Sequence, residues 1–194
     1  MTTEATEPAP HYLASRPIDT IQVDDTWSAV TVPASWGALV LDVLGDQSGP
    51  AFMDPVYRYM SWIIPPGGAA DWPDALDVGV DVCNTGDWVT VPGPEGHPSG
   101  TRWLRPPTDG QLTDPTTLRA ALEWIIGPLA DAAQLGFVEV CRYCGTPTRD
   151  AMVVSVYHSP SGSGHVSYAC RSCHHDTANG GDGRHLRVVR KGPQ

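Results

Sequence analysis

The spacing of apolar positions changes several times along the chain, and each change marks a predicted element. A helical period begins at Trp36, because apolar residues follow at three, four, seven and eight positions further on, at Leu39, Val40, Val43 and Leu44. Gly45 should end this helix, since glycine readily adopts the conformation that terminates one. The pattern therefore predicts one amphipathic helix over residues 36–44.

A longer helix is predicted to begin after residue 114. Asp114 stands at the expected N-cap and Pro115 at the first helical position, where each residue type is favoured. An apolar stripe follows, formed by Leu118, Ala121, Leu122, Ile125, Ile126 and Leu129. Gly127-Pro128 should kink or split the helix because proline lacks a backbone donor, and Gly136 should end it.

Short runs of β-branched and aromatic residues before the second helix predict strands. These runs cover residues 26–33, 50–53, 58–64, 80–82, 88–91 and 101–105. The NTGD segment at 84–87 is typical of a turn, so the runs on either side of it are expected to form a hairpin. The fold class predicted for this part is α+β, with a small mixed sheet and two main helices.

Composition divides the chain into three parts. Residues 1–16 are rich in Thr, Glu, Ala and Pro with little to bury, which predicts a disordered tail. The α+β domain is expected over 17–136 and a zinc ribbon with a basic C-terminal tail over 137–194. Residues 1–138 carry 5 Lys and Arg against 18 Asp and Glu, whereas 139–194 carry 7 against 4. The two domains are therefore opposite in net charge.

The sequence also indicates where in the cell the protein is expected. No apolar run approaches the roughly 20 residues that span a bilayer. The N-terminus MTTEATEPAP lacks the basic start and apolar centre of a signal peptide. We expect a cytoplasmic protein without a membrane partner.

Two Cys-x-x-Cys pairs carry the clearest candidate chemistry. CRYCG contains Cys141 and Cys144, and CRSCH contains Cys170 and Cys173. Two such turns can complete a tetrahedral shell of soft ligands, which predicts a structural Zn²⁺ because four cysteines leave no position open for water. The alternative, a pair of redox dithiols, would require a thioredoxin-like βαβ setting that the sequence lacks.

The residues between and after the pairs favour a small β module. Two β-rich segments flank SPSGSG and predict a hairpin, and HLRVVRK at 185–191 can add a third strand. The whole resembles a three-stranded zinc ribbon. His174 and His175 are expected at the surface rather than on the metal, and Cys83 as an ordinary buried strand cysteine.

Basic residues gather in this second part and predict a contact surface. The candidate binding residues are Arg142, Arg171, Arg184, Arg187, Arg190 and Lys191, with Arg149 nearby. Tyr143 and Tyr157 could stack on bases. A net charge of +3 beside a strongly acidic domain is a weak nucleic-acid signal, so protein and nucleic-acid partners both stay open.

Residues 79–103, GVDVCNTGDWVTVPGPEGHPSGTRW, resemble the closing part of the bifunctional primase/polymerase domain found in actinobacterial chromosomes and mobile elements. The resemblance implies that Asp81 takes the place of that family's late metal-binding acid. It departs elsewhere: Leu44 stands where the second acid of the paired-acid motif would fall, and RYMSWII presents Arg58 and no histidine. The resemblance implies a degenerate relative that keeps a platform without the chemistry.

Three functions follow as hypotheses. The first is a non-catalytic zinc-ribbon adaptor that acts with another protein, in an assembly linked to DNA metabolism or a mobile element. The second is a nucleic-acid-binding protein that uses the ribbon and basic tail. The third is a residual nucleotide-binding or nucleotidyl-transfer enzyme that uses Asp81. The missing catalytic motifs favour a protein that is not an enzyme.

Overall fold

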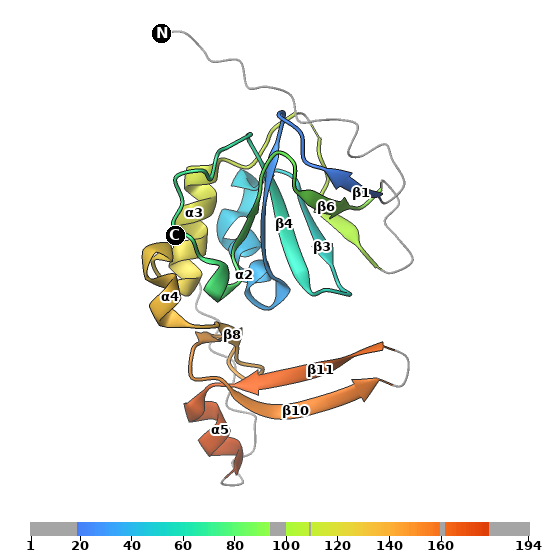
Figure 1. Cartoon of the computed structure of the whole chain (residues 1–194). Coiled ribbons are helices and arrows are strands. Elements are labelled where there is room, and N and C mark those ends of the chain that lie inside the picture. The colour runs from blue at the N-terminus through green and yellow to red at the C-terminus, as the bar shows by residue number, and fades with distance from the viewer. Residues whose placement is uncertain (1–18, 94–99, 109, 160–161, 179–194) are drawn as a thin grey trace. The chain divides into compact units, whose positions relative to one another are not determined.

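The computed structural model describes residues 19–93, 100–108, 110–159 and 162–178 (Figure 1). The chain divides into two compact units, unit 1 over residues 1–135 and unit 2 over residues 136–194. The predicted tail over 1–16 and the predicted third ribbon strand over 185–191 lie outside the described residues.

Unit 1 is built on a five-stranded sheet with the order β5-β2-β4-β3-β7. The strands are β2 (Ser28–Pro33), β3 (Ala51–Asp54), β4 (Tyr59–Ile64), β5 (Asp81–Cys83) and β7 (Arg102–Arg105). The prediction of a mixed sheet is wrong, since every ladder in this sheet is antiparallel. Helix α2 (Ala34–Leu44) connects β2 to β3. These two strands lie on either side of β4 and are both antiparallel to it, so they run in the same direction without pairing with each other.

Two helices cover one face of this sheet. Val30 and Val32 of β2 lie opposite Trp62 and Met60 of β4, and all four side chains are buried. They pack beneath α2 and α3 (Pro115–Ile126), which lie side by side (Figure 1). The helix predicted at 36–44 is thus confirmed, and it begins two residues earlier, directly after Pro33.

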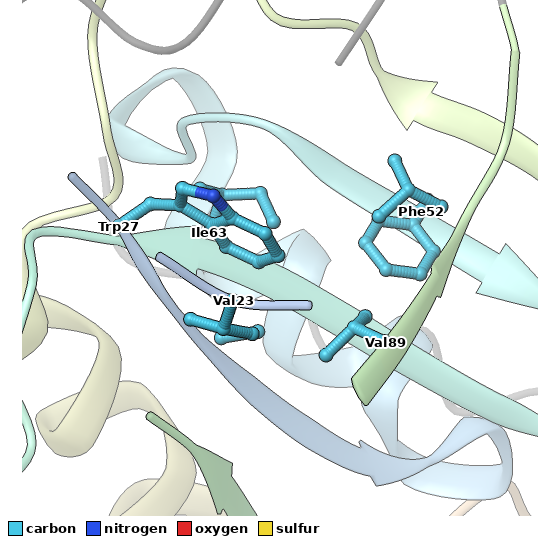
Figure 2. Close-up of a cluster of buried hydrophobic side chains, with 7 residues drawn as sticks. Val23, Trp27, Phe52, Ile63 and Val89 are labelled. Atoms are coloured by element: carbon cyan, nitrogen blue, oxygen red, sulfur yellow. The ribbon is translucent and has the colours of Figure 1, made fainter. Parts of the chain in front are cut away.

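A two-stranded ribbon covers the other face. Strands β1 (Asp19–Gln22) and β6 (Trp88–Val91) pair with each other. The buried cluster on this face includes Val23, Trp27 and Ile63 (Figure 2). Because both faces are covered, the five residues of β4 after Tyr59 are all buried, so this central strand shows no apolar-polar alternation.

The predicted hairpin between residues 80–82 and 88–91 is wrong. Strand β5 pairs with β2, whereas β6 pairs with β1. The turn residues 84–87 bond to the chain after β1 instead: Val23 N–H donates to Asp87 O at 2.8 Å, and Gly86 N–H donates to Val23 O at 2.9 Å. These bonds direct β6 onto the face of the sheet, where Val89 and Val91 are buried.

The second predicted helix is confirmed in its start and in its interruption. Asp114 caps α3, and Pro115 is the first helical residue. Gly127 ends α3 with φ 83°, and the chain continues as a short 3₁₀ turn, η3 (Leu129–Asp131), and a helical turn, α4 (Ala132–Leu135). Two further 3₁₀ turns are η1 (Gly45–Gln47) and η2 (Leu76–Val78).

The cap of α3 can be tested directly. Asp114 Oδ1 accepts hydrogen bonds from Thr117 N–H at 2.7 Å and from the Thr117 hydroxyl at 2.8 Å. Asp114→Ala removes both hydrogen bonds and should lower the free energy of unfolding of unit 1 by about 1 kcal/mol. Asp114→Asn keeps an acceptor oxygen and should cost much less. Urea denaturation of the two variants measures the difference, and equal losses would contradict the role of the cap.

The described residues of unit 2 form two antiparallel ladders and one helix. The ladders pair β8 (Glu139–Val140) with β9 (Pro147–Thr148), and β10 (Met152–Ser159) with β11 (Gly162–Ala169). The predicted hairpin is therefore present as β10 and β11. The helix, α5 (Arg171–Ala178), packs against this hairpin and contains the last cysteine. Neither α5 nor the β8–β9 ladder was expected from the sequence.

Candidate metal centre

The four predicted cysteine ligands come together in unit 2. Cys141 directly follows β8, Cys144 lies in the next turn, Cys170 separates β11 from α5, and Cys173 lies in the first turn of α5. Their sulfur atoms all lie within 4.8 Å of one another. The end of β8, the turn after it, the end of β11 and the start of α5 thus place four thiols around one point.

The sulfur separations suit a metal ion better than a disulfide. None of the five cysteines forms a disulfide, and Cys144 Sγ lies 3.9 Å from Cys170 Sγ. A disulfide requires about 2.05 Å. A tetrahedron of metal–sulfur bonds about 2.3 Å long has sulfur–sulfur edges of about 3.8 Å. The four thiols therefore fit a tetrahedral ion, which would bind all of them.

The first pair is held by a tight turn between β8 and β9. Gly145 N–H donates to Cys141 O at 2.8 Å, and Cys141 N–H donates to Thr146 O at 3.0 Å. Gly145 has φ 69°, in the left-handed region that favours glycine, which explains why CRYC is followed by this residue. The turn folds Cys144 back beside Cys141.

The second pair is held by the start of a helix. His174 N–H donates to Cys170 O at 2.9 Å, so Cys170 and Cys173 lie on one side of the first turn of α5. The two pairs are also tied together, because Arg142 N–H donates to Tyr168 O at 2.8 Å, two residues before Cys170. The hairpin thus brings the second pair back to the first, as the sequence predicted.

The thiols differ in their ionisation. Burial raises the pKa of Cys141, but backbone amide donors of Cys144, Cys170 and Tyr143 lower it by more, to about 6. Burial raises the pKa of Cys173, as do its hydrogen bonds with the other three cysteines. Backbone amides directed at a thiolate are what a metal–thiolate site needs, because the ligands bind deprotonated.

In the part of unit 2 that the structure describes, the core is small. Its buried cluster consists of Cys141, Ala169 and Cys173, with Tyr143, Val154 and Cys170 partly buried against it. Burying so little apolar surface does not offset the entropy of ordering the chain. A metal ion bound by these cysteines would supply the missing stabilisation.

The predicted basic residues are only partly described. Arg184, Arg187, Arg190 and Lys191 lie outside the described residues. Arg142 stacks on the Tyr143 ring with its guanidinium carbon 5.5 Å from the ring centre. Arg171 Nε lies 3.9 Å from Asp150 Oδ2, and Arg149 donates to Gly136 O at 2.8 Å. The described arginines thus have partners within unit 2.

The acid implied by the primase/polymerase resemblance, Asp81, belongs to no metal-binding cluster among the described residues. Asp81 begins β5 and lies opposite Thr31 of β2, whose hydroxyl is 2.8 Å from that of Ser61 on β4. In the described part of the chain, the four cysteines are the only cluster of three or more His, Cys, Asp or Glu side chains that could hold a metal. Leu44 lies in a helix, and residues 94–99, with part of the HPSG segment, are not described.

Cys83 is separate from the metal centre, in β5. Burial raises its pKa to about 11, with smaller contributions from the negative charges of Asp81 and Asp87. The predicted description as a strand cysteine is thus confirmed, with the side chain partly rather than fully buried.

This environment predicts slow alkylation of Cys83. The thiolate is the reactive form, and a pKa about two units above the ordinary 9.0 makes the thiolate fraction at pH 8 roughly 100-fold smaller. Iodoacetamide at pH 8 should therefore modify Cys83 far more slowly in the native protein than in urea, and the native rate should rise as the pH approaches 11. Peptide mass mapping separates Cys83 from the other cysteines. Equal native and unfolded rates would contradict the prediction.

Comparisons with known proteins do not assign a function to the site. A scan against protein-family models found no matching family, and searches of curated proteins and of solved structures found no match. Within the described ranges, no helix is long and apolar enough to cross a membrane. The chain is thus characterised by a mixed helix-and-strand fold and by a four-cysteine cluster compatible with a metal-binding module.

Proposed function

We propose that unit 2 is a zinc-held interaction module and that the protein is a non-catalytic adaptor that binds another protein. The observation that carries the proposal is the closed set of four sulfur ligands within 4.8 Å. Four thiolates complete a tetrahedral shell around Zn²⁺ and leave no position for water or substrate. A metal in this shell stabilises the fold and does not take part in catalysis.

The surface of the hairpin supports a protein partner. Val153 and Val156 of β10 are 54% and 52% exposed, although both are large apolar residues. They lie opposite Tyr168 and Val166 of β11. A register shift between Val153 and Ser155 adds one residue to β10, so the four side chains share one face of the hairpin although Val153 and Val156 are three positions apart. An uncharged apolar face of this kind favours contact with protein over contact with phosphate.

Nucleic acid remains the second candidate partner. The excess of Lys and Arg over Asp and Glu in residues 139–194, 7 against 4, is the observation that favours it. Against it, the described arginines of unit 2 have partners within that unit, and the rest of the chain is strongly acidic. We therefore place protein contact first, within an assembly linked to DNA metabolism or a mobile element.

One experiment tests the zinc site and the second candidate partner, nucleic acid. Protein purified without added zinc is analysed for metal by mass spectrometry and is then used in DNA and RNA gel shifts at low and high salt. We expect zinc and no shift. Zinc with a salt-sensitive shift that Arg142→Ala/Arg171→Ala weakens would replace the protein adaptor with a nucleic-acid-binding module. Absence of any metal would overturn the proposal altogether.

A further inference from the structure

The four cysteines divide into a buried pair and an accessible pair. Cys141 is 0% exposed and Cys173 is 8% exposed. Cys144 is exposed, and Cys170 is partly exposed. Each Cys-x-x-Cys segment contributes one member to the accessible pair, and the two accessible sulfurs lie 3.9 Å apart. An oxidant in solution therefore meets Cys144 first and has Cys170 beside it.

We propose that Cys144 is an oxidation site at which hydroperoxides drive formation of a Cys144–Cys170 disulfide, with release of the metal. This inference rests on the proposed zinc site. The measured product is a disulfide between Cys144 and Cys170. The inference can therefore be refuted while the proposed zinc site is still supported.

The reaction consumes one hydroperoxide per disulfide. The Cys144 thiolate attacks one peroxide oxygen, forming an S–O bond as the O–O bond breaks, and the departing oxygen takes a proton to leave as water or an alcohol. The Cys170 thiolate then attacks Cys144 Sγ, forming the S–S bond as the S–O bond breaks, and the released hydroxide takes a proton to become water. Two thiolates lose two electrons, which the peroxide gains.

Access selects this pair over the others. An oxidant in solution must reach the sulfur that it attacks, and the burial of Cys141 and Cys173 disfavours them as the first site of attack. The hydroxyl of Ser172 lies 3.2 Å from Cys170 Sγ, within hydrogen-bonding distance of the resolving sulfur. Cys83 lies in unit 1, where burial keeps its thiol protonated.

The disulfide would remove the conditions for metal binding. A cystine sulfur is a much poorer ligand than a thiolate, so only Cys141 and Cys173 would remain as ligands. Two ligands do not complete a tetrahedral shell, and among its described residues unit 2 has a small buried cluster to hold it without the metal. Thiol reductants reverse a disulfide, so reduction in the presence of zinc should restore the site.

The test uses the full chain loaded with zinc. Hydrogen peroxide is added in equimolar steps, zinc release is followed with a chromogenic chelator, and disulfides are assigned by peptide mass mapping without reduction. We expect zinc release to rise in parallel with the Cys144–Cys170 disulfide, and dithiothreitol with zinc to reverse both. Cys83→Ser, which lies outside the metal centre, should release zinc at the same rate.

Two outcomes would overturn the inference. One is retention of zinc at several equivalents of peroxide, and the other is a dominant disulfide between Cys141 and Cys173 or one that includes Cys83. A chain that carries no zinc before peroxide is added would instead refute the proposed function, so the two failures are distinguishable.

Discussion

Cys141→Ser should abolish zinc binding and unfold unit 2 while unit 1 stays folded. Cys141 is fully buried, receives the backbone donors that stabilise a thiolate, and belongs to the small cluster that forms the core of unit 2. Structural zinc contributes roughly 10–16 kcal/mol of apparent binding free energy in small modules. Loss of one buried thiolate removes most of this stabilisation, and the buried cluster among the described residues of unit 2 is too small to replace it.

Hydrogen exchange with mass spectrometry measures the effect one unit at a time. Backbone amides of β10, β11 and α5 should lose protection in Cys141→Ser, whereas those of β2 and β4 should keep it. Cys83→Ser is the matched control, because it removes a thiol outside the metal centre and should retain the zinc. Full protection of β10 and β11 in Cys141→Ser would show that unit 2 is stable without the metal.

Trp62→Ala should cause the largest loss of stability in unit 1, about 3–5 kcal/mol. Trp62 lies on the central strand β4, between Val30 of β2 and Ala51 of β3, and is 0% exposed. Its indole Nε1–H donates to Ser48 Oγ at 3.2 Å. Alanine at this position would leave a large cavity between the sheet and the covering helices, and the Ser48 hydroxyl would lose a partner.

Trp124→Ala provides the matched control. Trp124 lies on α3 with 80% of its surface exposed, so its removal creates no cavity and should change the free energy of unfolding by less than about 0.5 kcal/mol. Urea denaturation followed by circular dichroism compares the two variants. Similar losses for both would contradict the placement of the core between β4 and the helices.

Features that depend on neighbouring residues were predictable from the sequence. The cap and start of α3 follow from Asp114 and Pro115, because both act within one helical turn. The cysteine cluster follows from the two Cys-x-x-Cys pairs, since spacing alone restricts each pair to one side of a turn. Both features depend on residues that are close in sequence, and both are present in the fold.

Features that depend on distant pairing were not predictable. The NTGD turn suggested a hairpin, but Val23, about 60 residues earlier, bonds to Gly86 and Asp87 and draws β6 onto the face of the sheet. Helix α5 was missed because its sequence RSCHHDTA has no apolar stripe, and the helix is positioned by Cys173 and by packing on the hairpin. The difference in exposure among the four thiols likewise arises only from the tertiary arrangement.

The most direct test of the central claim is X-ray absorption spectroscopy at the zinc edge on the purified chain. Four sulfur neighbours at about 2.3 Å are predicted, which is the signature of a closed four-cysteine shell. A shell of three sulfurs and one nitrogen would mean that a histidine such as His174 or His175 replaces a cysteine. A sample with no zinc, or with iron in its place, would contradict the assignment of the site as structural zinc.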